Sequence, residues 1–302
     1  MCAAFQGVLD AQRSLAGRLS LLLQTAHPPT LIVLHRLSRY LKSGEAYFDS
    51  AFGFGVNLWD GTAHWVIYLV MIYGLASPNP AVYRPVYLYW AGSILVSLAL
   101  LLPAGFVGNH SHNVQASTAL NIPYVLFPLL FLKRVLDTPR VSKPVARAPA
   151  VLEVMFAAFF AIVALITFVR FAAAAGSEWD WAVQWRQMEG HLDEPSRFFH
   201  LFAYMGHFYL VPVYVVVVIC LLVGASTSQA AALSDILLLV AGGVAESTFT
   251  FVVSATHPKL GEHIVKDEHL GRFYTVNAVL VLGIHLAAIL SLKLRLFNGL
   301  LA

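Results

Sequence analysis

The chain has 302 residues, of which 59% are hydrophobic and only 12% are charged, and its mean hydropathy is +0.72. Soluble domains carry about 25% charged residues, so this chain has too few charges to cover a water-exposed surface. A soluble globular protein is therefore excluded, and the composition predicts a polytopic membrane protein. The 19 basic and 16 acidic residues form no strongly basic face, which argues against nucleic acid as a partner.

Transmembrane helices are predicted from the apolar runs. About 20 apolar residues are needed to cross the hydrocarbon core, where every backbone amide must bond within its helix. Seven runs meet this need: 57–76, 86–106, 117–135, 151–172, 199–222, 234–255 and 273–295. The uncharged run 85–132 is too long for one span, and Pro103 and Gly108 are among the turn residues that divide it. We therefore expect an all-α helical bundle with about seven transmembrane helices.

The N-terminal segment has a weaker signal. Its apolar stretch, 19–35, is about 17 residues long and is interrupted by His27-Pro28-Pro29. Residues 19–37 are therefore predicted to form either a broken span or an amphipathic helix at the membrane interface.

Loop charges leave the membrane orientation open. Basic residues within and beside the linker 136–150 favour a cytosolic position for that loop and for the C-terminus. Arg36, Arg39 and Lys42 favour the opposite orientation. A glycosylation pattern begins at Asn109, in a short loop where we expect it to be unused.

Ionisable side chains within the predicted spans are the first site candidates, because such groups are costly in lipid. Asp60 and His64 lie four residues apart, on one helix face that Asn57 extends. Asp60 is either an acid in an apolar pocket that protonates or holds a lipidic ligand, or part of an ion pair at the membrane interface. In the first case Trp59 would pack against the apolar body of the ligand.

Glu246 is the second buried acid, among small residues that allow close helix packing. It has either a structural, hydrogen-bonded role or a catalytic one. The candidate catalytic residues are thus Asp60, His64 and Glu246. The predicted ligand-binding residues are Asn57, Trp59, Asp60, His64, Asn121 and Asn277, of which the last two also suit interhelical hydrogen bonding.

No metal or cofactor is expected from the sequence. His257, His263 and His269 recur at six-residue intervals, which matches no compact metal-ligand spacing. P-loop, dinucleotide-binding and hydrolase motifs are also missing from the sequence.

A weak internal repeat indicates two tandem helical units. Ala91-Gly92-Ser93 matches Ala241-Gly242-Gly243, and Asn121 matches Asn277, at similar offsets of about 150 and 156 residues. The second unit then has four helices, whereas the first has three clear ones.

The segment from Asn57 to His64, with sequence NLWDGTAH, closely resembles the first EXPERA domain of the transmembrane 6 superfamily. Further resemblances follow in the same order at 88–93, 121–124, 189–195, 203–205 and 241–243. The division that this resemblance implies is a divergent segment 1–43, a first EXPERA-like unit 44–135 with its first helix missing or altered, the linker 136–150, a second unit 151–295 and a tail 296–302.

The resemblance implies a fold shared with emopamil-binding sterol isomerase and the sigma-two receptor. It also implies an endoplasmic reticulum or related endomembrane location, the lysosome included, and a role in sterol and triglyceride handling. Partners would be membrane lipids or a sterol, with lipid-metabolism proteins of the endoplasmic reticulum as possible additional partners. In these relatives a helical bundle encloses a lipid pocket, and Asp60 resembles the acid on the second EXPERA helix.

Three functions are compatible with this sequence. The first expectation is a protein that regulates lipid metabolism by binding a sterol-like lipid. The alternative is an intramembrane sterol Δ8–Δ7 isomerase, although a two-acid or histidine–acid isomerase site is incomplete in either unit. A transporter ranks last, because the two units show no paired broken helices.

Overall fold

The computed structural model of the chain describes residues 50–76, 80–107, 116–137, 146–194 and 197–300. Regular structure in these ranges is almost entirely helical, which confirms the all-α class. The exceptions are the two-residue strands β1 (Ala146–Arg147) and β2 (Leu294–Arg295), which pair in parallel. The predictions for the segment 1–43, for the possible span 19–37 and for Asn109 lie outside the described residues.

Three helical stretches form the first half of the described chain. The first is continuous and consists of α3 (Ala51–Trp59), the π-helix η2 (Asp60–His64) and α4 (Trp65–Ala76). It is followed by α5 (Pro80–Phe106) and then by the 3-10 helix η4 (Ala116–Asn121), which leads into α6 (Ile122–Asp137). The hydroxyl of Ser50 accepts the N–H of Gly53 at 2.9 Å and so caps the first helix.

The second half begins with α7 (Ala150–Ala174), the short α8 (Asp180–Met188) and the 3-10 helix η5 (Gly190–Asp193). A second continuous stretch follows, made of α9 (Phe198–Met205), the π-helix η6 (Gly206–Leu210) and α10 (Val211–Val223). The last elements are α11 (Thr227–Ala255), η7 (Pro258–His263) and α12 (Asp267–Lys293). α11 starts at a capping box in which Ser226 and Gln229 each bond the other's backbone N–H.

Five helices of the described chain are long and apolar enough to span a membrane: Tyr83–Phe106, Ala150–Ala174, Phe198–Val223, Thr227–Ala255 and Asp267–Lys293. The chain is thus a multi-pass membrane protein, but the expected count of seven is not confirmed. The other two expected spans are helical over 51–76 and 116–137. The former carries Asp60 and His64 near its middle. The α-helix of the latter has 16 residues, about 24 Å.

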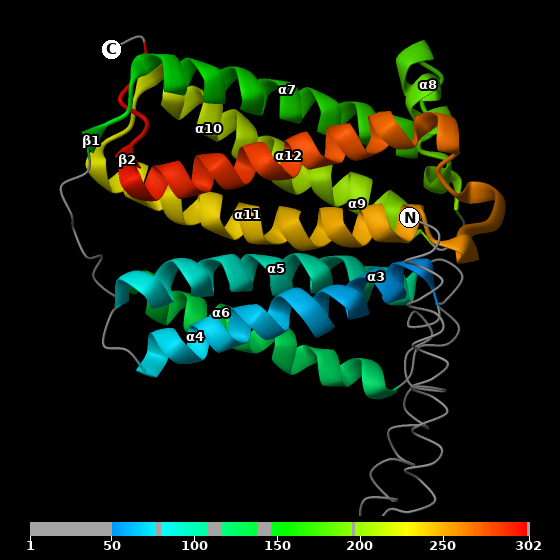
Figure 1. Ribbon diagram of the computed structural model, residues 1–302, viewed down its shortest axis with the longest axis horizontal. Coiled ribbons are helices and arrows are strands. Elements are labelled where there is room, and N and C mark those ends of the chain that lie inside the picture. The colour runs from blue at the N-terminus through cyan, green and yellow to red at the C-terminus, as the bar shows by residue number, and fades with distance from the viewer. Residues whose placement is uncertain (1–49, 77–79, 108–115, 138–145, 195–196, 301–302) are drawn as a thin grey trace, which may run out of the picture. The chain divides into compact units, whose positions relative to one another are not determined.

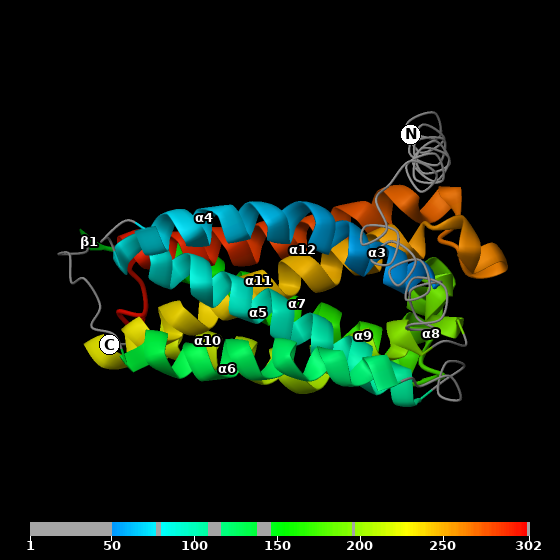
Figure 2. The same cartoon turned by 90° about the horizontal axis from the view of Figure 1, so that it is seen from below.

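Helices α5 and α11 form the centre of the bundle. Their apolar windows are 56% and 72% buried, against 17–28% for the other three spanning helices, which present most of their surface to lipid. In Figure 1, α5 lies beside α11, with α3, α4 and α6 on one side of this pair and α7, α10 and α12 on the other. Figure 2 shows the same bundle from below.

Glycines bring α5 and α11 into backbone contact. The two helices run in the same direction, because Arg84 pairs with Asp235 and, farther along both, Ser93 pairs with Glu246. A Cβ atom on Gly92 would lie 1.9 Å from the carbonyl oxygen of Leu239, and one on Gly242 would lie 1.8 Å from that of Tyr89. These two positions therefore require glycine, and the close approach places Ser93 within hydrogen-bonding distance of Glu246.

Candidate functional site

The π-helix η2 carries Asp60 and His64 within the first helical stretch. π-helical insertions are rare and occur frequently at functional sites. Asp60 Oδ1 lies 2.7 Å from Nδ1 of His64. The Asp60 side chain is 49% exposed, whereas that of His64 is 2% exposed. The pair therefore connects the outer face of this helix with the bundle interior.

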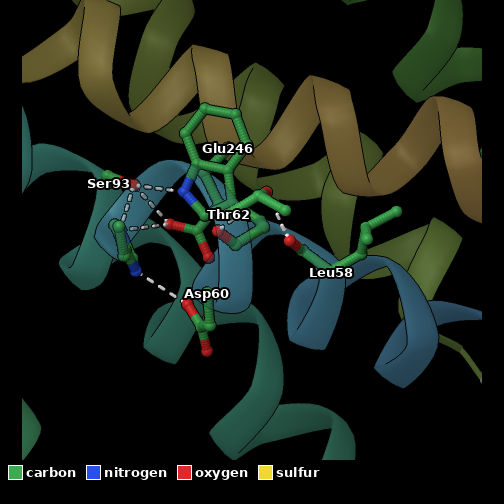
Figure 3. A network of polar contacts seen from close by, with 7 residues as sticks. Leu58, Asp60, Thr62, Ser93 and Glu246 are labelled. Atoms are coloured by element: carbon green, nitrogen blue, oxygen red, sulfur yellow. Dashed lines mark hydrogen bonds and ion pairs between the residues drawn. The ribbon is translucent and has the colours of Figure 1, made fainter. Parts of the chain in front are cut away.

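Ser93 of α5 joins this pair to Glu246 of α11. The hydroxyl oxygen of Ser93 lies 2.8 Å from Nε2 of His64, donates to Oε2 of Glu246 at 2.6 Å, and accepts the indole N–H of Trp59 at 3.1 Å. Figure 3 shows the resulting network, in which dashed lines mark the contacts at Ser93 and at Asp60. Three helical segments, α3–η2, α5 and α11, thus meet at one completely buried hydroxyl.

Two proton arrangements satisfy these contacts. In the first, a doubly protonated His64 donates to Asp60 and to Ser93, and Ser93 donates to an ionised Glu246. In the second, Glu246 is protonated and donates to Ser93, Ser93 donates to Nε2 of a neutral His64, and Nδ1–H still donates to Asp60. The arrangements differ by one proton shift across each of two short hydrogen bonds. The hydrogen bonds through Ser93 therefore allow a proton to be shared between His64 and Glu246.

The order of Asp60, His64 and Ser93 is also that of a hydrolase triad, in which an acid orients the histidine that activates a serine. Ser93 does not suit that role. Its hydroxyl is completely buried and already contacts Trp59, His64 and Glu246. The arrangement supports proton sharing rather than attack on a substrate.

A second buried polar cluster centres on Arg170 of α7. Its guanidinium donates to both carboxylate oxygens of Glu189, at 2.6–3.2 Å, and to Oδ1 of Asn277 at 3.2 Å. It also lies 4.8 Å from the centre of the Phe251 ring, a cation–π contact. Glu189 is completely buried, so the pair ties α7 to the segment after α8. Neither charged residue was predicted as a site residue, because the two come from different elements and share no local spacing.

A third, partly buried polar cluster ties the two central helices together. Arg84 of α5 donates to Oδ2 of Asp235 of α11 at 2.7 Å and also contacts the carbonyl oxygen of Val135. This pair too was missed from the sequence, because Arg84 and Asp235 are 151 residues apart.

A pocket lies among the helices of the second half of the chain, with α5 forming part of its wall. It is partly open to the surface and is lined from α5, α7, α9, η6, α10, α11 and α12. The lining is mostly apolar, with Thr167, Arg170, Ser247 and Thr248 among its polar members. Tyr209 is the exposed residue of the lining, so the pocket reaches the outer surface beside η6.

The structure brings together some of the predicted site residues. Trp59, His64 and Glu246 meet at Ser93, and Asp60 joins them through His64. The sequence indicated Ser93 only as a member of the Ala-Gly-Ser repeat. Asn277 instead supports Arg170 and donates to the carbonyl of Phe273 at 2.8 Å.

The remaining predicted ligand residues lie elsewhere. Asn57 donates to the carbonyl of Gly53 at 2.8 Å, and Asn121 is the last residue of η4. None of the six predicted ligand-binding residues lines the pocket described above. Their ligand roles stay predictions.

The stability of the protein should depend on pH through His191, which lies in η5, outside the spanning helices. Its ring is completely buried against Phe199, Phe251 and Phe273, at centroid distances of 4.6–5.6 Å. Burial, followed by the charge of Arg170, lowers the pKa of His191 well below its ordinary value of 6.5. The native ring therefore stays neutral while the unfolded ring takes up a proton below about pH 6.5. Unfolding then binds protons, so stability falls as the pH decreases.

We expect the free energy of unfolding to decrease by up to about 1.4 kcal/mol per pH unit below pH 6.5 on account of this one group. Thermal unfolding of the detergent-solubilised protein at pH 7.5, 6.5 and 5.5 measures the effect. The variant His191→Phe should show a flatter dependence on pH. Equal slopes for the variant and the parent protein would contradict the assignment to His191.

Comparison with known proteins identifies similar chains. Residues 31–146 match a family model described as "Transmembrane 6 superfamily member 2-like, transmembrane domain". The chain is 28% identical over 265 residues to Transmembrane 6 superfamily member 2 of Mus musculus, and 26% identical over 266 residues to that of Homo sapiens. Each alignment covers 82% of this chain and 68% of the relative. No solved structure shows significant similarity.

Proposed function

Because the chain is a relative of the transmembrane 6 superfamily, as its sequence motifs indicated, we propose that it is an endomembrane protein that regulates lipid metabolism by binding a sterol-like lipid. The observation that supports this most directly is the pocket between α7, α10, α11 and α12, which is largely apolar and reaches the outer surface at Tyr209. Ligand pockets have this character, with few polar groups that fix orientation. An opening toward lipid suits a ligand that enters from the bilayer.

The polar network at Ser93 supports a different role for Asp60, His64 and Glu246. They do not line the pocket, but Glu246 lies between Gly243 and Ser247 on α11, and both of these do. We propose that the network holds α5 and α11 together behind the pocket wall. The geometry therefore favours lipid binding over catalysis by these residues.

A sterol isomerase is the second candidate function, and the observation that favours it is the proton-sharing path from His64 to Glu246. An isomerase needs an acid and a base on either side of a ring double bond. Microsomes that contain the protein would then convert a Δ8 sterol above the background of microsomes that lack it. Absence of conversion would leave binding as the function.

Blocking the pocket should abolish lipid binding. Gly206 and Thr167 both line the pocket. A Cβ atom on Gly206 would lie 3.0 Å from Cγ2 of Thr167, so the leucine side chain in Gly206→Leu would occupy pocket space beside Thr167. We expect labelling of the purified protein by a diazirine sterol to fall about tenfold, as for the loss of most of the apolar contacts.

The matched control is Gly105→Leu on α5. A Cβ atom at Gly105 meets nothing within 4 Å, and Gly105 does not line the pocket, so labelling should not change. Equal labelling of the Gly206→Leu variant and the parent protein would show that the pocket is not the lipid site.

A further inference from the structure

One nitrogen of the Arg170 guanidinium forms no hydrogen bond within the described residues. Nε and Nη2 bond Glu189, and Nη2 also bonds Asn277. Across the described part of the chain, Nη1 has no hydrogen-bond partner, although the residue is only 4% exposed and lines the pocket. An arginine presents two N–H donors at that nitrogen. Nη1 is not among the fully buried, unpaired side-chain atoms of the described residues, so its donors stay accessible in the pocket that Arg170 lines. These donors suit an acceptor atom of a pocket ligand.

The position of Arg170 indicates which part of a lipid it would meet. Arg170 lies four residues before the end of α7, close to the membrane boundary, whereas Val163 of the same lining lies seven residues deeper, or about 10 Å. Tyr214 and Ile284 extend the apolar wall at that deeper level. A lipid in this pocket therefore has its polar head at Arg170 and its apolar body toward the bilayer centre.

The charge balance limits the chemistry of the head. Glu189 already neutralises Arg170 through three hydrogen bonds, and both side chains are at most 5% exposed. A carboxylate ligand would add an unpaired negative charge to this buried pair, and a buried unpaired charge is strongly unfavourable. An ammonium head would place a cation beside the guanidinium and would have no acceptor to offer.

We propose that the pocket selects an uncharged lipid whose head carries a hydrogen-bond acceptor oxygen, a sterol hydroxyl or a glyceride ester, bound to Nη1 of Arg170. Cationic amphiphiles and free fatty acids are then poor ligands. The proposal rests on the lipid-binding function above and specifies the head group that the pocket recognises.

Competition for labelling by a diazirine sterol with a free hydroxyl tests the proposal on the purified full chain in nanodiscs. The competitors are cholesterol, dioleoylglycerol, oleate, oleylamine and cholestane, which is a sterol body without the oxygen. We expect cholesterol or dioleoylglycerol to compete at least about tenfold better than the other three, as for the loss of a hydrogen bond to a charged group. The better of these two identifies the source of the oxygen.

The variant Arg170→Lys retains the positive charge opposite Glu189 but lacks Nη1. It should reduce the preference for cholesterol over cholestane from about tenfold to near unity. Arg84→Lys is the control, because Arg84 forms a largely buried ion pair with Asp235 and does not line the pocket. Its preference should equal that of the parent protein. If Arg170→Lys does not fold, the competitor series on the parent protein decides by itself.

The outcomes separate this proposal from the function on which it depends. Labelling that is insensitive to Gly206→Leu overturns the lipid-binding function. Labelling that requires the open pocket, with equal competition by cholesterol, cholestane and oleylamine, overturns only the head-group proposal.

Discussion

Replacement of Gly92 or Gly242 by alanine is expected to lower the free energy of unfolding by about 3 kcal/mol or more. The added methyl group would lie 1.9 Å or 1.8 Å from a backbone carbonyl oxygen of the facing helix, far inside van der Waals contact. A backbone atom cannot turn aside as a side chain does, so α5 and α11 must separate. Separation also lengthens the hydrogen bond between Ser93 and Glu246, which adds to the loss.

Thermal unfolding in detergent, followed by size-exclusion chromatography, measures this effect. We expect the melting temperature to fall by about 6–12 °C, at 2–4 °C per kcal/mol for a chain of this size class. Gly105→Ala on the same helix is the control, because a Cβ atom there meets nothing within 4 Å. It should be neutral or slightly stabilising, since alanine favours a helix by up to about 1 kcal/mol over glycine.

The double variant Gly92→Ala/Gly242→Ala gives a sharper test. Both methyl groups act on one contact, so the second should cost less than the first once the helices have separated. Two full and additive losses would show that the glycines act at independent sites. Unchanged melting temperatures for both single variants would contradict the close helix approach itself.

The apolar runs predicted the helical class and located the helices, because hydropathy is a local property of the chain. Five spans are confirmed in the described residues, with ends within about seven residues of those expected. The remaining two are not confirmed as spans: polar residues interrupt one run at Asp60 and His64, and the α-helix of the other is short, at Ile122–Asp137. The division into two tandem units stays a prediction.

Only those residues of the candidate site that are close in sequence could be predicted to lie together. Asp60 and His64 are four residues apart, and that alone placed them on one face. Ser93 and Glu246 come from helices that are distant in sequence, so their contact depends on the glycine-mediated packing. The pairing of Arg170 with Glu189 was not predictable, although Glu189 begins the family-like segment 189–195, because a pair formed between a helix and a connecting segment has no characteristic spacing.

Arg170→Met is expected to lower the free energy of unfolding by about 3–5 kcal/mol, because it leaves the carboxylate of Glu189 buried without its partner. Glu189 is completely buried and has Arg170 as its bidentate partner. The loss should appear as a large decrease in melting temperature or as failure to recover monodisperse protein.

The double variant Arg170→Met/Glu189→Leu should recover most of this loss, since replacing a buried pair with apolar residues of similar volume is often neutral. Glu262→Ala provides the exposed control: Glu262 is 90% exposed and 3.9 Å from His263, so its removal should have no measurable effect. A double variant as unstable as the single one would show that Arg170 stabilises the fold through Asn277 and the aromatic rings rather than by neutralising Glu189. Because the head-group proposal assumes a neutralised Arg170, that result would also remove its argument against anionic lipids.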